Sequence, residues 1–183
     1  MATNIYEPCT NPISGETFRA ISFDKDAFVM QWTVQPEGYV PFEHVHLNQD
    51  EIFHVKKGEM RVVIAGKEQI AKAGESITIP KRVVHVAYNN KAEVLDCIVE
   101  YKPGLDHDVF MQCLCGLTND GLIDKKGGIS IPRMGYFLAR MNAKCMARPT
   151  EIPAPLFNIA LRFFYLRGVL SGWSRLFEKY TAG

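Results

Sequence analysis

The sequence lacks a surplus of either charge and lacks the cysteine spacing of a zinc ribbon or redox motif. Its 183 residues include 21 Lys or Arg and 20 Asp or Glu, which gives a net charge of +1. Proteins that bind the phosphate backbone of nucleic acids usually carry a basic surplus, so we expect no nucleic acid partner. The cysteines form no CxxC pair, and we expect reduced thiols in a cytoplasmic protein. The cysteines are Cys9, Cys97, Cys113, Cys115 and Cys145.

Long apolar runs are missing as well. Residues 1–18 contain no basic start followed by an apolar stretch, so we expect no secretory signal. The apolar segment from Leu156 to Trp173 is interrupted by Arg162 and Arg167. It falls short of the roughly 20 apolar residues of a spanning helix. We expect a packed helix or a contact between two copies of the chain, with attachment to a membrane surface as the alternative.

Short apolar runs separated by turn residues fill the sequence between Thr17 and Tyr101. The runs are AFVMQWTV, EIFHV, MRVVIAG, SITIP, VVHVAYN and EVLDCIVEY, and the turns include QPEG, KKGE and KAGE. Short strands at such regular spacing are typical of a sandwich or barrel. We therefore predict a mainly β domain over residues 1–103, including an N-terminal arm.

After Pro103 the pattern changes to apolar residues at helical intervals. The segment LDHDVFMQCLCGL predicts one helix, with His107 near its start, and IPRMGYFLARMNAKCMA predicts a second. A third helix is expected in the segment from Thr150 to Gly183, with Pro155 near its start. These segments predict a helical extension over residues 104–183. Cys113 and Cys115, two positions apart on a helix, would face different directions and are not expected to form a site.

Histidine and glutamate residues are concentrated in the stretch GYVPFEHVHLNQDEIFHVKKG. Side chains two apart in a strand share a face, so His44 and His46 would project together. Glu51 would return beside them after a short break. The same alternation places His54 on the opposite face of its strand, where it should not be a ligand. His85, in another strand of the same region, is a fourth candidate for a site with nitrogen and oxygen ligands.

These residues carry a resemblance to the cupin family. The first motif of that family has a glycine, a His-x-His pair, a glutamate and a second glycine, which correspond to Gly38, His44, His46, Glu51 and Gly58. The spacing fits, with four residues between His46 and Glu51. The resemblance covers about half of the chain and leaves the C-terminal third unexplained.

The second cupin motif is matched by Gly74, Pro80, His85 and Asn89. Arg82 stands where the motif has a glycine, which places the local turn in question because arginine resists the backbone angles that glycine permits. The other glycines are expected at hairpin ends, where a positive φ costs little.

The resemblance implies a small double-stranded β-helix, or jelly-roll barrel, with its ligands pointing inward. It implies one divalent transition-metal ion, Fe, Mn, Ni, Zn or Cu, held by His44, His46, Glu51 and His85. By strand alternation Phe42 would line the cavity. Asn89 would serve a turn or hydrogen-bond a ligating imidazole from outside the metal site.

Two classes of function follow for a small molecule bound in the barrel. The first is a metal-dependent enzyme, such as a dioxygenase, an isomerase or a decarboxylase, since similar cupins include all three. The second is a non-catalytic module that binds a small ligand. A third possibility gives the helical tail the main role, in homodimer formation or attachment to a membrane surface. Fold alone does not choose among them.

Overall fold

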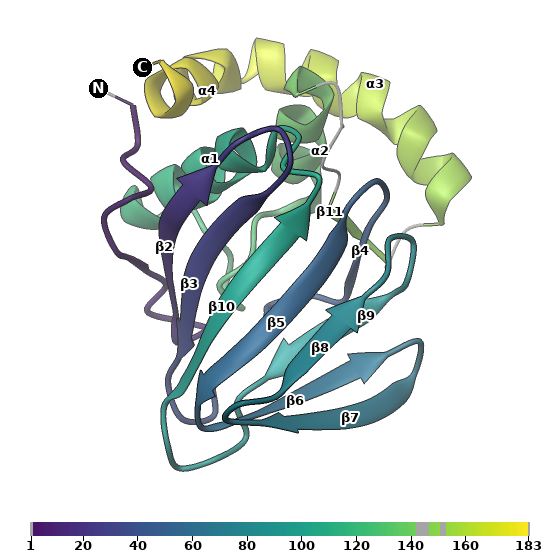
Figure 1. Ribbon diagram of the computed structural model, residues 1–183. Helices are drawn as coiled ribbons and strands as arrows, with labels where there is room; N and C mark the ends of the chain where they lie inside the picture. Colours follow the sequence, from purple (N-terminus) through teal and green to yellow (C-terminus); the bar gives the residue numbers. More distant parts are fainter. Residues whose placement is uncertain (1, 142–146, 151–152, 183) are drawn as a thin grey trace.

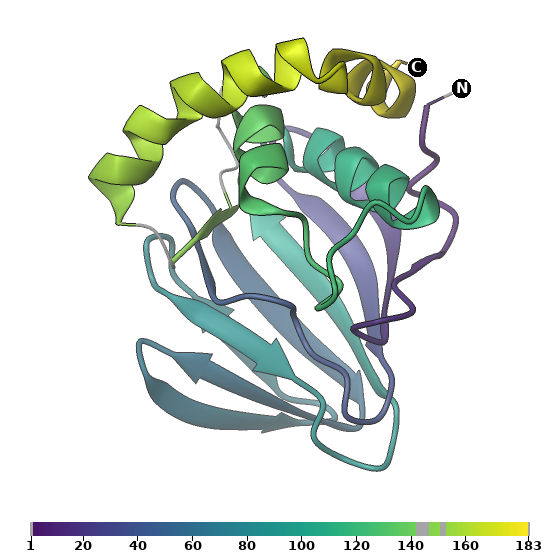
Figure 2. The same ribbon diagram turned by 180° about the vertical axis from the view of Figure 1, so that it is seen from behind.

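Two antiparallel sheets form the body of the protein, and four helices gather over one end of it (Figures 1 and 2). The computed structural model describes residues 2–141, 147–150 and 153–182. The first sheet has the order β1-β2-β3-β10-β5-β8 and the second the order β11-β4-β9-β6-β7. The mainly β jelly-roll barrel with a helical extension is thus confirmed. Its strands are β1 (Cys9–Thr10), β2 (Glu16–Phe23), β3 (Phe28–Val34), β4 (His44–His46), β5 (Asp50–Lys57), β6 (Glu59–Ile64), β7 (Lys67–Lys72), β8 (Ser76–Ile79), β9 (His85–Tyr88), β10 (Leu95–Lys102) and β11 (Ala147–Pro149).

Alternating side chains on the central strands build the core. In β3 the buried positions are Phe28, Met30, Trp32 and Val34, with half-buried residues between them. The neighbouring β10 alternates in the same way through Leu95, Cys97, Val99 and Tyr101. Strands with one face on a core follow this period of two. The same alternation in β5 turns Glu51 inward.

The sequence pattern did not predict β1, β2, β7 and β11. In β7 every residue except Ala71 is exposed, because this strand lies at the edge of its sheet. A polar edge strand has no apolar alternation by which to recognise it. The β11 strand pairs with β4, opposite His44 and His46.

The helices are α1 (His107–Asn119), α2 (Ile131–Arg140), α3 (Ala154–Leu170) and α4 (Trp173–Thr181). His107 begins α1, as expected. The second predicted helix was too long: α2 ends at Arg140, and Ala147 already belongs to β11. The third was predicted as one helix, but Gly172 with a φ of 73° separates α3 from α4. The predicted boundary at Pro103 stays a prediction, and β11 from the C-terminal part pairs with β4 of the barrel.

One motif position, Gly38, differs from the expected turn geometry. Gly58 has a positive φ of 81°, as predicted. Gly38 has no positive φ, and glycine is needed there for space: a Cβ would lie 2.5 Å from Val34 Cγ1 and 2.8 Å from the Ser14 carbonyl oxygen. Arg82 adopts a φ of 67°, so the turn keeps its left-handed conformation in spite of the arginine.

The cysteines lie in the interior wherever the structure describes them. Among the described residues, Cys9, Cys97, Cys113 and Cys115 are free and buried. Cys145 lies outside the described residues.

The helices of the extension are short or interrupted by charge. No helix in the described part of the chain is both long and apolar enough to cross a membrane.

Candidate metal centre

Four potential metal ligands meet inside the barrel. His44, His46, Glu51 and His85 each offer one ligand atom, and these atoms lie within 4.8 Å of one another. All four side chains are buried. Three imidazoles and one carboxylate suit Fe(II), Mn(II), Ni(II), Zn(II) or Cu(II). The residues brought together are therefore the four predicted from the sequence, and the group could hold a metal ion.

The site is assembled from both sheets of the barrel. His44 and His46 lie on β4, and His85 on β9 stands opposite His44 in the strand register. Glu51 approaches from β5 in the other sheet, where it pairs with Tyr101 of β10. A ligand set that spans two sheets depends on the closed barrel, so folding brings the ligands together.

Backbone carbonyls orient two of the imidazoles. His44 Nδ1 lies 3.3 Å from the Phe42 carbonyl oxygen, and His85 Nδ1 lies 3.0 Å from the Val83 carbonyl oxygen. Because a carbonyl oxygen only accepts, we assign the proton of each ring to Nδ1. Each Nε2 then keeps a lone pair for a metal ion.

Several buried polar atoms face one another without hydrogen bonds. Glu51 Oε2 lies 2.7 Å from His85 Nε2 and 3.5 Å from His46 Nε2. Within the described residues, these three atoms and His46 Nδ1 make no hydrogen bond of acceptable geometry. Buried polar groups are nearly always satisfied. The convergence of unsatisfied atoms on one point fits a cation bound between them.

The electrostatics of the site favour a neutral His44 imidazole and an ionised Glu51 carboxylate, and they favour the protonated form of His85. Burial, together with the charges of His85 and His46, holds the pKa of His44 well below its usual range. Burial would raise the pKa of Glu51, but His85 and His46 outweigh it and hold that pKa well below its ordinary value. Burial lowers the pKa of His85, but the Glu51 carboxylate has the larger, opposite effect. The pKa of His85 is therefore raised.

A fourth histidine, His107, lies beside the group. The sequence interpretation placed it at a helix start and not near the ligands. His107 is buried, and its ring stacks on Tyr101 at a centroid distance of 3.7 Å, with the His46 ring 5.9 Å away. Its Nδ1 lies 3.3 Å from Gln49 Oε1. Gln49 in turn donates to the Pro103 and Gly104 carbonyl oxygens. No pattern in the sequence predicted this position, because only the docking of α1 on the barrel brings His107 to the site.

The structure also places the other residues that the sequence singled out. Phe42 lines the cavity, with its ring 5.5 Å from that of His44. His54 lies outside the group and contacts Ser76 Oγ and Glu100 Oε1, as strand alternation predicted.

Asn89 does not support a ligating imidazole. Its side-chain amide donates to the backbone carbonyls of Val34, Gln35 and Glu93, and its Oδ1 accepts from the backbone N–H of Lys91. The orienting role predicted for it falls to the carbonyls of Phe42 and Val83. The hydrogen bonds of Asn89 therefore fit its predicted role in a turn and not the one at an imidazole.

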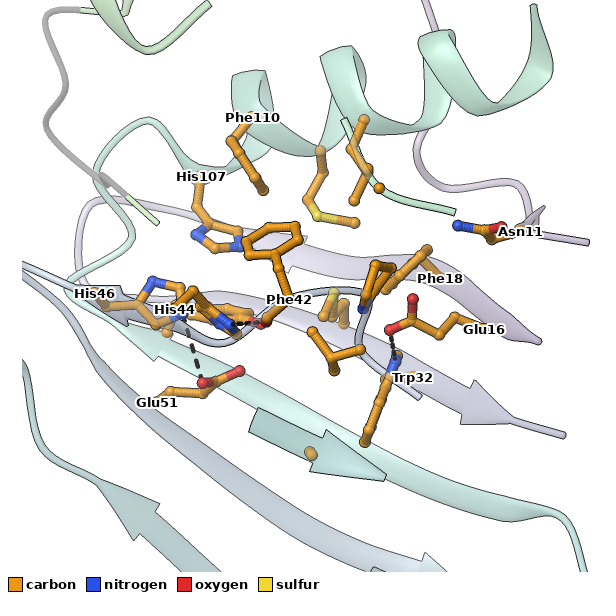
Figure 3. Close-up of a pocket in the computed structure, with 18 of the residues that line it drawn as sticks. Asn11, Glu16, Phe18, Trp32, Phe42, His44, His46, Glu51, His107 and Phe110 are labelled. Carbon is orange, nitrogen blue, oxygen red and sulfur yellow. Dashed lines mark hydrogen bonds and ion pairs between the residues drawn. The ribbon is translucent and has the colours of Figure 1, made fainter. Parts of the chain in front are cut away.

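One cavity adjoins the ligand group and extends away from it between the first sheet and α1 (Figure 3). Its wall is mainly apolar and aromatic. On the side away from the histidines it is bounded by Glu16 and Asn11. The lining also includes Phe18, Met30, Trp32, Phe42, Phe53, Phe110, Met111, Leu114 and Ile129. A mainly apolar pocket with a few polar groups is the usual form of a small-molecule site.

Comparisons with known proteins find one family model and a set of solved structures. A family model described as "Cupin domain" matches residues 30–101. A search of curated proteins finds no match. Solved structures with a similar fold include an uncharacterised double-stranded β-helix protein from Klebsiella pneumoniae, with 23% identity over 49% of this chain and 77% of the other and a TM-score of 0.46. KdgF from Halomonas sp. has 18% identity over 51% and 84% of the chains, with a TM-score of 0.48. A sugar phosphate isomerase from Silicibacter pomeroyi has 18% identity over 49% and 60%, with a TM-score of 0.45.

Proposed function

We propose that the cupin-superfamily domain of residues 30–101 binds one divalent transition-metal ion and acts as an enzyme on a small molecule in the adjoining cavity. The observation that carries the proposal is the convergence of four buried ligand atoms within 4.8 Å beside an apolar cavity. The reaction class would be that of a dioxygenase, an isomerase or a decarboxylase. We also propose that the protein is cytoplasmic.

The residues of the site divide the work between holding the ion and shaping the cavity. His44, His46, Glu51 and His85 would hold the ion, and the carbonyls of Phe42 and Val83 keep two of the imidazoles aligned. When bound, such an ion supplies Lewis acid or redox chemistry at its open positions. The apolar wall would exclude water from a bound substrate and strengthen electrostatic interactions within the site.

A turnover experiment separates an enzyme from a binding module. The metal-loaded protein is incubated with an extract of small metabolites, and the extract is compared by mass spectrometry with one treated with the His46→Ala variant. An enzyme depletes a compound and produces another in amounts far above the protein concentration. Retention of a compound at no more than one equivalent, without product, would favour the non-catalytic module.

Metal affinity should fall as the pH is lowered. Burial lowers the pKa of His85, but the Glu51 carboxylate outweighs it and raises that pKa, and the imidazole must lose its proton to bind a metal ion. Below the pKa of His85 we expect the affinity to fall about tenfold for each pH unit. Titration calorimetry in buffers of different ionisation enthalpy should detect proton release on binding. An affinity that is independent of pH, with no proton release, would contradict this protonation scheme.

We also propose that the outer face of α3 joins two copies of the chain. Leu156, Ile159, Phe163, Leu166 and Leu170 are between 58% and 89% exposed. They recur at alternating intervals of three and four residues, the spacing of a helix-pairing seam. An exposed stripe of this length is unusual in a monomer.

The inner face of α3 is already packed on the protein. Phe157 is fully buried, and a Cβ at Gly168 would lie 2.1 Å from the Tyr136 ring. A helix that is apolar on both faces is typically buried within protein, whereas an interfacial membrane helix has a strongly polar face. A second copy is therefore the occupant that the composition of α3 favours.

The Phe163→Glu and Leu166→Glu double variant should convert a dimer into a monomer. Placing carboxylates in an apolar seam removes its contacts and adds like charges across it. Light scattering after size-exclusion chromatography measures the change, with Ile70→Glu as the control because Ile70 is 52% exposed on the distant β7. A monomeric wild-type chain, or a wild-type chain that sediments with vesicles through this face, would refute pairing between copies.

A further inference from the structure

A buried carboxyl group, Glu16, bounds the cavity away from the potential metal ligands. Its side chain is 2% exposed and lines the same cavity as His44, His46, Glu51 and His85. Figure 3 shows it on the opposite side of the pocket from His46 and Glu51, next to Trp32. The proposed metal chemistry gives this group no task.

The hydrogen bonds of Glu16 leave acceptor sites free. Trp32 Nε1 donates to Oε1 over 3.0 Å, and Ser14 Oγ donates to Oε2 over 2.8 Å. A carboxylate has about four acceptor positions, so each oxygen keeps capacity for one more donor. Among the described residues no cation forms an ion pair with Glu16.

A purely structural role does not require an ionisable group at this position. A neutral amide could also accept the Trp32 N–H, without the cost of burying a charge. Burial raises the pKa of Glu16 to about 7, against the opposing effect of its bonds from Ser14 and Trp32. Ionisable groups that are shifted in this way and placed on a cavity wall are frequent in ligand sites.

The cavity between Glu16 and the metal ligands is lined with aromatic and aliphatic side chains. Phe18, Trp32, Phe42 and Phe53 contribute aromatic rings, and the Trp32 and Phe53 centroids lie 5.5 Å apart. Such walls select a flat or compact apolar body. The complementary ligand therefore has polar groups at its two ends only.

The outer hollow next to the cavity carries positive charge. It is lined by Lys125 and Lys126 and shares Pro41, Phe42, Gly128 and Ile129 with the inner cavity. The acidic residue of this hollow, Asp124, accepts hydrogen bonds from the backbone N–H groups of Lys126 and Gly128. Lysines beside a cavity raise the local concentration of anions. An anionic oxygen group is also a suitable ligand for a divalent metal ion.

We propose that Glu16 is a second recognition point of the cavity and accepts a hydrogen bond from a hydroxyl or amino group of a small, mainly apolar carboxylate whose carboxyl end binds the metal ion. The proposal rests on the proposed metal function for its other end. Glu16 would thus determine specificity at the end of the ligand that is remote from the metal. A ligand that lacks the donor would leave the Glu16 acceptor sites unpaired, which is how polar sites reject such analogues.

Matched pairs of aromatic acids test the assignment. The probes are benzoate, phenylacetate and 3-phenylpropanoate, each compared with its 4-hydroxy and 4-amino derivative. Binding is measured by titration calorimetry with full-length Zn(II)-loaded protein and with the Glu16→Gln variant. For at least one chain length we expect the hydroxy or amino probe to bind the wild type about tenfold more tightly than its parent, a common effect of one charge-assisted hydrogen bond.

In Glu16→Gln this preference should fall at least severalfold, whereas the affinity for the parent acid should be unchanged. Glu178→Gln, at an exposed position on α4, serves as the control and should behave as the wild type. Equal preferences in the wild type and Glu16→Gln, or no preference at any chain length, would overturn the role of Glu16. A preference that persists in chelator-treated protein would support the hydrogen bond to Glu16. It would contradict only the binding of the ligand's carboxyl end to the metal ion.

Discussion

Replacing His46 with alanine is expected to lower the metal affinity of the full-length protein by more than about 100-fold, since even outer-shell partners of metal ligands are worth 10–100-fold. His46 is 3% exposed, and neither of its ring nitrogens has a hydrogen-bond partner in the described structure. The substitution removes one of three imidazoles from a group whose ligand atoms lie within 4.8 Å. Elemental analysis of the purified protein and competition with a metal indicator would measure the loss.

His54→Ala is the matched control for this experiment. His54 belongs to the strand that carries Glu51, but it faces Ser76 and Glu100 on the other side of the sheet. We expect this variant to retain one equivalent of metal with unchanged affinity. Equal metal content in the wild type, His46→Ala and His54→Ala would show that the bound metal lies elsewhere.

Glu16→Gln is expected to change the pH dependence of stability. The folded protein holds the pKa of Glu16 at about 7, chiefly through burial, above the 4.5 of an ordinary glutamate. Below about pH 4.5 the side chain is protonated in the folded and unfolded states, and it costs no stability. As the pH rises towards 7 the unfolded chain gives up this proton more readily, so the folded state loses stability. The full loss amounts to about 3 kcal/mol above pH 7.

Glutamine does not ionise, so the variant should escape this loss. The free energy of unfolding of Glu16→Gln, relative to the wild type, is expected to rise by up to about 3 kcal/mol between about pH 4.5 and 8. Urea unfolding of the metal-free proteins across this range measures the difference, and Glu178→Gln corrects for a general loss of negative charge. A difference between the wild type and Glu16→Gln that stays constant with pH would show that Glu16 has an ordinary pKa.

Strand alternation and motif spacing were sufficient to predict the four ligand candidates. Because side chains two apart share a face, the sequence pattern alone united His44 with His46 and separated Glu51 from His54. The alternation is reliable here because the barrel interior is closed and largely apolar. It also succeeded for Phe42, which shares the face of His44.

Residues outside the regular strands were harder to interpret. Glu16 lies at the first residue of β2, a strand that was not predicted, and only the pairing with β3 brings it to Trp32. His107 reaches the site because α1 begins close to the barrel mouth, and no local pattern specifies that docking. For Asn89, residue type was compatible with two roles, and only the positions of the surrounding carbonyls distinguish them.

The helical region shows the same dependence on tertiary contacts. The second predicted helix ran to Ala147. The chain instead forms β11 at Ala147–Pro149, because β4 offers an unpaired edge. Helical periodicity is a local signal, and pairing with a distant strand overrides it. For the segment of α3 a packed helix or a contact between copies was expected; Phe157 on its inner face is buried, and the contact between copies stays a prediction.

X-ray absorption spectroscopy of the metal-loaded, full-length protein tests the metal centre most directly. We predict one equivalent of metal surrounded by nitrogen and oxygen neighbours at about 2.0–2.2 Å, with the multiple scattering of three imidazoles. In His46→Ala the imidazole scattering should fall or the metal should be lost, whereas His54→Ala should give the wild-type spectrum. Sulfur neighbours at about 2.3 Å, or a protein that takes up no stoichiometric metal, would contradict the assignment of His44, His46, Glu51 and His85 as the metal centre.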